Sequence, residues 1–183
     1  MTSILKVDQL QDSGGNAIIT SNGAGSITTA SGLNTAITNA GFVTSANAGK
    51  VLQVVSTSLG SGDISTTSTS FVDVTGFSAS ITPVSTSNKI LILVDIPSYI
   101  TNSAANGVFT ILRDSTNLGN STWGFGWLRG GTDTFLIASA NYLDSPSSLS
   151  SLTYKIQYKI SAGTFTMTPN GSQGTLTLME IKG

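Results

Sequence analysis

The chain has 183 residues, of which 9% are charged, with a formal net charge of −1 and neither histidine nor cysteine. Histidine and cysteine supply common general bases, nucleophiles and zinc ligands, so their absence excludes disulfides and disfavours an enzyme, a metal site or a cofactor. The near-neutral charge, the scattered basic residues and the lack of a long apolar run also argue against nucleic-acid binding and membrane insertion.

Serine and threonine occupy many of the positions that charged residues usually take, and this has two interpretations. Disordered chains are poor in apolar residues, whereas 39% of this chain is hydrophobic and its mean hydropathy is +0.21. Threonine suits the exposed face of a β-strand because its branched Cβ is already restricted there. The composition therefore favours a folded, mainly β protein.

Residues 1–50 differ from the rest of the chain. Residues 4–20 alternate in polarity around a Gly-Gly-Asn turn and predict a small hairpin, which has too little apolar surface to be stable alone. Residues 31–42 have apolar side chains at helical spacing and predict one short helix, and residues 44–49 predict a linker. The N-terminus lacks the apolar core of a signal peptide, so we expect a soluble protein made in a cytoplasm.

From residue 51 the pattern changes to strands, of which three are informative. Residues 71–81 alternate, but Asp73 interrupts the apolar face and predicts a bulge near Gly76. Residues 89–96 form a largely apolar run, which predicts a strand covered on both faces and ended by Pro97. Residues 152–161 alternate strictly, as in a strand with one wet face.

Other apolar segments complete the predicted sheet structure, and the spacer at residues 162–163 predicts a hairpin between two of the strands. Roughly eight short strands separated by turn residues predict an antiparallel β-sandwich or jelly roll over residues 51–183. No repeat period is visible, which disfavours a β-helix. The remaining predicted strands are residues 51–55, 108–113, 135–140, 164–168 and 175–181.

Catalytic motifs are missing or incomplete. The surroundings of Gly49 and Lys50 lack the glycine and hydroxyl residue of a phosphate loop, and residues 124–129 lack the third glycine of a dinucleotide fingerprint. The carboxylates lie singly, at turns or strand edges, which argues against a glycosidase pair. They are Asp63, Asp73, Asp95, Asp114, Asp133, Asp144 and Glu180.

The segment WGFGW, residues 123–127, is the most unusual local feature. On a regular strand Trp123, Phe125 and Trp127 would project together, and with Arg129 they could stack on sugar rings. The alternative is that these aromatic residues form core or an interface, and we favour this alternative because large aromatics dominate both. Two further candidate ligand residues, Tyr99 and Tyr142, follow apolar strands near the bases of polar loops, where binding residues often lie.

Seven segments of the chain are distinctive in combination. They are ILKVDQLQDSGGNAII (4–19), AGKVLQVV (48–55), TSTSFVDVTGFSASITP (67–83), KILILV (89–94), ILRDSTNLG (111–119), YLDSP (142–146) and TLTLMEIKG (175–183). Together these segments resemble tail-fibre and minor structural proteins of bacteriophages, especially marine and cyanobacterial phages. The resemblance implies a virion protein, usually a homotrimer, whose N-terminal part attaches to other virion proteins and whose C-terminal β-domain faces outward on the particle. For attachment it points to Ile4, Leu5, Val7 and Leu10.

Three hypotheses remain open at this point. The first is a homotrimeric short fibre built from an attachment segment, residues 1–50, and a β-sandwich knob, residues 51–183. The second makes the knob a lectin-like module that contacts glycan on the host surface. The third is a head fibre or cement protein that decorates and stabilises the capsid.

Overall fold

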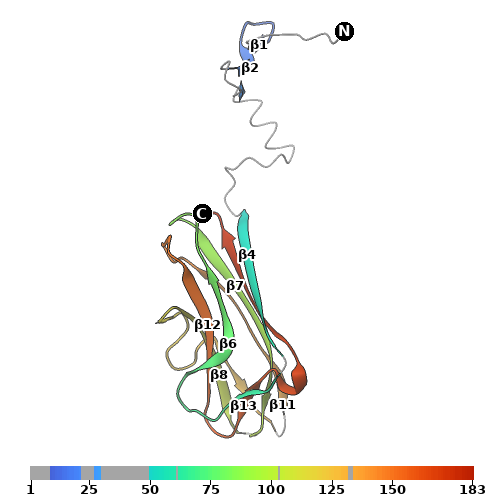
Figure 1. Ribbon diagram of the computed structural model, residues 1–183, viewed down its shortest axis with the longest axis vertical. Helices are drawn as coiled ribbons and strands as arrows, with labels where there is room; N and C mark the ends of the chain where they lie inside the picture. Colours follow the sequence, from blue (N-terminus) through green and yellow to red (C-terminus); the bar gives the residue numbers. More distant parts are fainter. Residues whose placement is uncertain (1–8, 22–26, 30–49, 61, 103, 132–133) are drawn as a thin grey trace. The chain divides into compact units, whose positions relative to one another are not determined.

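The structure is a computed structural model that describes residues 9–21, 27–29, 50–60, 62–102, 104–131 and 134–183. The chain divides into two units, Met1–Asn47 and Ala48–Gly183, and each is described by itself (Figure 1). The helix predicted for residues 31–42 lies outside the described residues, as do Ile4, Leu5, Val7 and Asp133. No helix in the described part of the chain is long and apolar enough to cross a membrane.

The N-terminal unit contains a small antiparallel sheet. Strands β1 (Gln9–Gln11) and β2 (Ala17–Ser21) form the predicted hairpin, and β3 (Ile27–Thr29), which was not predicted, pairs with β2. The Asp12 carboxylate accepts hydrogen bonds from the backbone N–H groups of Gly14 and Asn16 at 2.8 and 2.9 Å. Hydrogen bonds from Asn16 lower the pKa of Asp12 and hold the turn in the form that aspartate favours.

The C-terminal unit consists of two sheets. The first sheet contains, in spatial order, β4 (Val51–Leu59), β14 (Gly174–Ile181), β7 (Lys89–Ile100) and β11 (Thr134–Asp144). Two short strands extend it, since β13 (Phe165–Met167) continues along β7 beyond the end of β14, and β5 (Ile64–Thr66) pairs with β13. All these pairs are antiparallel.

The second sheet has the order β10 (Gly126–Arg129), β8 (Asn106–Arg113), β12 (Leu152–Ile160) and β6 (Val72–Ile81). The short β9 (Thr116–Asn117) pairs with β8 on the same side as β10. Figure 1 shows these long strands stacked in layers within the C-terminal unit. The short β5, β9 and β10 were not predicted from the sequence.

The pairing of the long strands is nested. β4 pairs with β14, β6 with β12, β7 with β11 and β8 with β10. The chain can therefore be described as one long antiparallel ribbon that reverses direction between β8 and β10. The ribbon is rolled up, so that successive strand pairs belong alternately to the first and the second sheet. This arrangement is a jelly roll, and it confirms the predicted antiparallel sandwich.

The core lies between the inner faces of the two sheets. On β7 the residues Ile90, Ile92, Val94 and Ile96 have no exposed surface, and on β12 the apolar residues from Leu152 to Ile160 are at most 7% exposed. The predicted half-buried strand at residues 152–161 is thus confirmed. The interpretation of β7 as covered on both faces is wrong, because its alternate residues, from Leu91 to Tyr99, are only half-buried or exposed.

Strand β7 also continues past Pro97, contrary to the prediction that this proline ends it. In an antiparallel ladder the N–H and C=O of one residue point to the same neighbouring strand. The carbonyl of Pro97 accepts a hydrogen bond from the N–H of Thr168 at 2.8 Å, at the junction where β13 ends and β14 has not yet begun. Pro97 therefore lies at an interruption of the ladder, between the last pair with β13 and the first pair with β14, where the missing N–H of proline is tolerated.

The predicted bulge in β6 is confirmed. The register with β12 shifts between Lys155 and Gln157, and Gly76 has a φ of +78°, a conformation that glycine adopts without strain. The shift changes which residues face the core, so that Val74 and Phe77 are buried while Asp73 faces water. The sequence alternation alone placed Asp73 on the same face as Phe77.

The predicted hairpin at residues 162–163 is wrong. β12 belongs to the second sheet and β13 to the first, so Gly163, with a φ of +76°, turns the chain from one layer to the other. Tyr158 and Phe165 on either side of this crossover contact each other in the core, with ring centroids 5.7 Å apart. Alternation within each segment is the same for a hairpin and for a crossover, which explains the error.

Glu180 on β14 is fully buried. Its carboxylate accepts hydrogen bonds from Asn88 Nδ2 at 2.6 Å, Gln53 Nε2 at 2.6 Å and the Val84 N–H at 2.8 Å. Burial acts to raise the pKa of Glu180, but the hydrogen bonds from Asn88, Gln53 and Val84 outweigh it and lower the pKa below its ordinary value of 4.5. The charged form is therefore bound more tightly in the folded state than in the unfolded chain.

We expect Glu180→Gln to lower the free energy of unfolding by about 2 kcal/mol near neutral pH, because hydrogen bonds to a charged acceptor are lost. Because folding lowers the pKa of Glu180, the stability that its charged form contributes is complete above pH 4.5. This stability is lost as the pH falls through the lower pKa of the folded state. The difference between wild type and variant in urea unfolding should therefore shrink in acid. A difference that stays constant from neutral to acid pH would contradict this assignment.

Candidate functional site

The outer face of the second sheet brings together side chains from three strands. In the register of β10, β8 and β12, Trp127 lies opposite Val108, and Val108 lies opposite Lys159. One step along, Arg129 lies opposite Asn106. The Asn106 carbonyl accepts a hydrogen bond from the Ser161 N–H, and the Asn106 N–H donates to Ser161 Oγ. These residues alternate with core residues such as Phe109 and Tyr158, so their side chains leave the sheet on the side away from the core.

Trp123 and Trp127 form an exposed aromatic pair beside this face. Their ring centroids are 6.3 Å apart, and they are 49% and 51% exposed. Asn120 Oδ1 accepts hydrogen bonds from the N–H groups of Thr122 and Trp123, at 2.8 and 2.9 Å, which fixes the turn that carries Trp123. Gly124 in this turn has a φ of +56°, and a Cβ there would collide with the Phe109 carbonyl, so the turn requires glycine.

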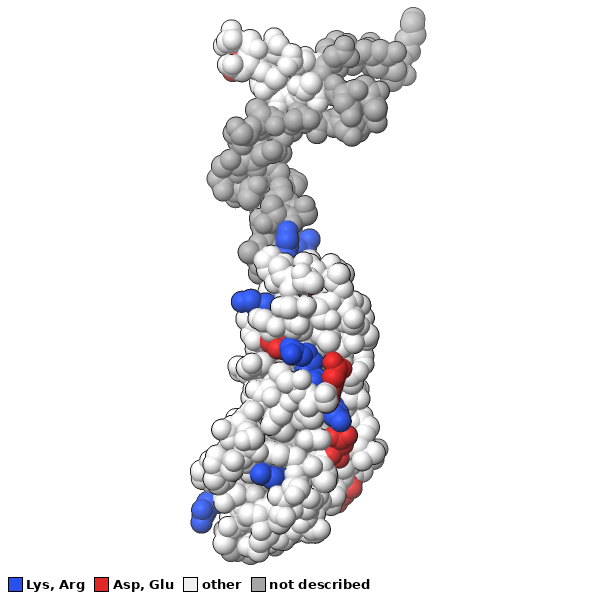
Figure 2. Space-filling model, turned by 90° about the vertical axis from the view of Figure 1, so that its left-hand side faces the viewer, with Lys and Arg blue, Asp and Glu red and all other residues white. Residues whose placement is uncertain are grey.

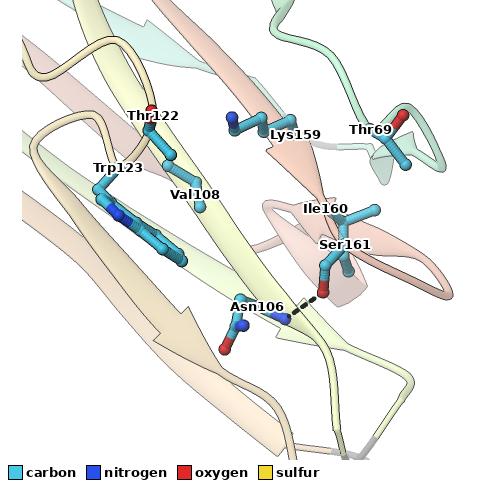
Figure 3. A pocket seen from close by; sticks show the side chains of 8 residues that line it. All are labelled: Thr69, Asn106, Val108, Thr122, Trp123, Lys159, Ile160 and Ser161. Carbon is cyan, nitrogen blue, oxygen red and sulfur yellow. Dashed lines mark hydrogen bonds between the residues drawn. The ribbon is translucent and has the colours of Figure 1, made fainter.

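A pocket of about 340 Å³ opens between the Trp123 turn and β12. In Figure 3, Val108 lies between the Trp123 ring on one side and Lys159 on the other, and Ser161 lies beside Asn106 further along. Val108 is only 3% exposed although it points away from the core. The pocket thus has an apolar base with polar groups around it, and its lining residues are Thr69, Asn106, Val108, Thr122, Trp123, Lys159, Ile160 and Ser161.

Asn106 offers unused hydrogen-bonding capacity at the pocket. Its backbone N–H donates to Ser161 Oγ at 2.9 Å, which orients the serine. Its side-chain Oδ1 is buried and has no hydrogen-bond partner among the described residues. A buried acceptor without a partner costs free energy, and a donor from a ligand or a water molecule would remove that cost.

Positive charge around the pocket is not neutralised by carboxylates. Lys159 Nζ lies 4.4 Å from the centroid of the Phe71 ring, a cation–π contact that leaves its charge in place. The ion pairs within the described part of the chain are Arg113 with Asp144 and Lys155 with Asp73, so neither Lys159 nor Arg129 belongs to one. On the face seen in Figure 2, basic and acidic groups alternate in a short band, and other basic groups near the lower end stand apart from acidic ones.

The structure separates the residues that the sequence analysis grouped as ligand candidates. Trp123, Trp127 and Arg129 share the outer face of the second sheet. Phe125 does not project with the tryptophans, because it is half-buried and packs edge-on against Tyr142, with ring centroids 5.2 Å apart. Tyr99 lies on the other sheet, 4.8 Å from the ring of Phe135, so these residues do not form one site.

Asn106, Lys159 and Ser161 were not singled out from the sequence. The strict alternation of residues 152–161 already placed Lys159 and Ser161 on the wet face of a strand, so a signal for them was present. Asn106 gave no such signal, because only the pairing of β8 with β10 and β12 places it beside Trp127 and Ser161.

Among the carboxylates, Asp144 belongs to a buried network and not to a catalytic pair. It accepts two hydrogen bonds of 2.8 Å from Arg113 Nη1 and one of 2.7 Å from the Tyr154 hydroxyl. Burial and the hydrogen bond to Asp144 raise the pKa of Tyr154, so the hydroxyl stays protonated and continues to donate. In the part of the chain that the structure describes, no cluster of acidic residues could hold a metal ion.

A second surface of interest is the outer face of the first sheet. An apolar row crosses the full width of this sheet, because Val54 lies opposite Met179, Met179 opposite Leu91, and Leu91 opposite Leu143. Its two edge strands, β4 and β11, carry large apolar side chains that remain exposed. They are Val51, Leu52, Val54, Phe135, Ile137 and Leu143, with exposed fractions from 37% to 64%.

The far end of this face combines apolar knobs with a hollow. Ile137 is 64% exposed and lies opposite Pro97, and Phe135 is 60% exposed and lies opposite Tyr99. An open hollow of about 610 Å³ lies next to them, lined also by Pro169 and Ser172. On β7 the exposed and charged Asp95 lies between the apolar row at Leu91 and the apolar far end at Pro97 and Tyr99.

No protein-family model and no curated protein matches the sequence. Among solved structures, the chain is similar to one from the T13 IBDV viral particle, with a TM-score of 0.44, 12% identity, and coverage of 73% of this chain and 36% of that chain. The infectious bursal disease virus VP2 subviral particle gives a TM-score of 0.44, 14% identity, and 73% and 34% coverage. The structure of the Gt strain of that virus gives a TM-score of 0.43 and 11% identity, with coverage of 73% of this chain and 38% of that chain. The chain therefore spans little more than a third of the length of these viral chains.

Proposed function

We propose that this chain is a structural component of a virus particle, a homotrimeric short fibre of a bacteriophage. Residues 1–47 would attach it to other virion proteins, and the jelly-roll domain would face outward and contact host glycan. The jelly roll alone does not assign this role, because one fold supports many functions. The observation that carries the proposal is the exposed apolar outer face of the first sheet.

That face has the properties of a surface that another protein covers. Monomeric soluble proteins rarely leave large contiguous apolar patches in water, and here one apolar row crosses all four long strands. A second copy of the chain is the occupant that fits best, since the net charge of −1 produces little repulsion between copies. Phe135 and Ile137 would project towards the second copy, and the hollow next to them could receive a side chain from that copy.

The described part of the N-terminal unit supports an attachment role, because its hairpin buries little surface. Within its described hairpin, residues 9–16 are exposed and residues 17–20 are only half-buried. Leu10, one of the residues proposed for attachment, is 52% exposed. Such a small sheet needs further contacts to be stable, and copies of the same chain or the particle would supply them.

Static light scattering on the full-length protein tests the proposal. We expect a mass of three times the 18.7 kDa of one chain at micromolar concentration. A stable monomer would overturn it. If the trimer forms, a cryo-EM map of the intact particle separates the two remaining arrangements, because a short fibre lies on the tail and a decoration protein lies on the capsid.

A further inference from the structure

We propose that the pocket between Trp123 and Lys159 binds a sugar that carries a carboxylate, such as a uronic or sialic acid unit of a surface polysaccharide. This inference rests on the glycan contact in the proposed function and names the class of glycan. It is carried by the pocket's shape, its aromatic wall, its unused hydrogen-bonding groups and its unpaired positive charge.

The aromatic part of the site suits the flat face of a sugar ring. Trp123 lines the pocket with its ring towards Asn106 (Figure 3). Trp127 provides a second platform, with its ring centroid 6.3 Å from that of Trp123. Both rings keep about half of their surface exposed, so a ligand can reach them without displacing protein groups. A volume of about 340 Å³ is at the lower end of the range for ligand pockets, and it suits one or two sugar units.

The polar lining suits the hydroxyl groups of a sugar. Asn106 lines the pocket, and its buried Oδ1 has no partner among the described residues. Thr69, Thr122 and Ser161, which carry hydroxyl groups, also line the pocket. A ring flanked by an aromatic face and by hydroxyl-binding groups is recognised on both its apolar and its polar sides.

The charge selects an acidic sugar over a neutral one. Lys159 lines the pocket and Arg129 follows Trp127 on the same outer face, and neither is in an ion pair in the described part of the chain. The carboxylates nearest in the strand register, such as Asp73, are engaged by Lys155 and Gln157. A carboxylate on the ligand would therefore be attracted by Lys159 and Arg129, whose partners in the strand register, Val108 and Asn106, carry no charge.

The experiment compares sugars that differ in charge but share a ring. The full-length protein is titrated with an oligogalacturonide and its methyl ester, and with sialyllactose and its methyl ester, by isothermal calorimetry at low salt. We expect at least one acidic sugar to bind about tenfold or more tightly than its neutral counterpart. Added salt should weaken the acidic sugar's binding, because the attraction is electrostatic and partly exposed to solvent.

Three variants assign the binding to this pocket. Lys159→Gln should remove the preference for the acidic sugar, and Trp123→Ala should weaken both sugars of the pair. Lys155→Gln is the matched control, because Lys155 lies on the same face of β12, is paired with Asp73 and does not line the pocket. It should leave binding unchanged. Thermal unfolding of each variant shows whether the fold is kept.

The outcomes separate this inference from the proposed function. Equal binding of acidic and neutral sugars, or unchanged preference in Lys159→Gln, would overturn the acidic specificity. No binding to any of the four sugars would overturn the pocket as a glycan site. The virion role is tested separately, by the mass of the oligomer and by its location on the particle, and neither measurement depends on sugar binding.

Discussion

Replacing Asp144 with alanine is expected to lower the free energy of unfolding by about 3–5 kcal/mol, the range seen when one partner of a buried ion pair is removed. The Asp144 side chain is 6% exposed and that of Arg113 is 22% exposed. The substitution would leave the Arg113 guanidinium without its two hydrogen bonds and the Tyr154 hydroxyl without its acceptor in the core. Urea unfolding of the full-length protein measures the change.

The pair of Lys155 with Asp73 is a control within the same protein. Its N–O distance of 2.9 Å is close to the 2.8 Å of the buried pair, but the Asp73 side chain is 52% exposed. Asp73→Ala should therefore cost about 1 kcal/mol or less, because solvent screens the attraction. Equal losses for the two variants would show that burial does not control the strength of these pairs, and would contradict the prediction.

Ile137→Asp is expected to dissociate the proposed trimer. Ile137 is 64% exposed on the edge strand β11, so a charged side chain there is tolerated by the isolated domain. In the assembly it would be buried without a partner, which costs about 2 kcal/mol or more and corresponds to roughly a thirtyfold weaker association. Light scattering over a concentration series should show monomers where the wild type is trimeric.

Leu149→Asp provides the comparison for this variant. Leu149 is 59% exposed but lies in the loop between β11 and β12 and not on a strand of the first sheet. It should leave the oligomer intact while making the same change in charge. If Ile137→Asp remains trimeric and folded, the outer face of the first sheet is not the contact between copies.

Much of the local structure could be predicted from the sequence, because it depends on neighbours along the chain. The alternation of residues 152–161 is that of β12, and Asp73 and Gly76 together mark the bulge in β6. The errors arose where the information is not local. Pro97 continues a strand because β13 and β14 leave a gap beside it, and no pattern around residue 97 reveals that gap.

In the candidate site, too, some features were visible in the local sequence and others depend on long-range strand pairing. Trp123 and Trp127 were recognisable as unusual, but their separation from Phe125 follows from the positive φ of Gly124, which turns the chain before β10 begins. Asn106 and Lys159 are 53 positions apart in numbering, and they meet only because β8 lies between β10 and β12. Such a long-range pairing has no trace in the composition or periodicity of either strand.

The amino-acid sequence by itself determined that this is a β protein of low charge, with strands that alternate between a core face and a face rich in serine and threonine. These properties follow from side-chain chemistry repeated at a period of two residues. Only the tertiary structure decided the nested pairing of the jelly roll, the apolar row across its first sheet and the pocket on its second. Each of these depends on which distant strands become neighbours, and alternation within a strand carries no information on its partner.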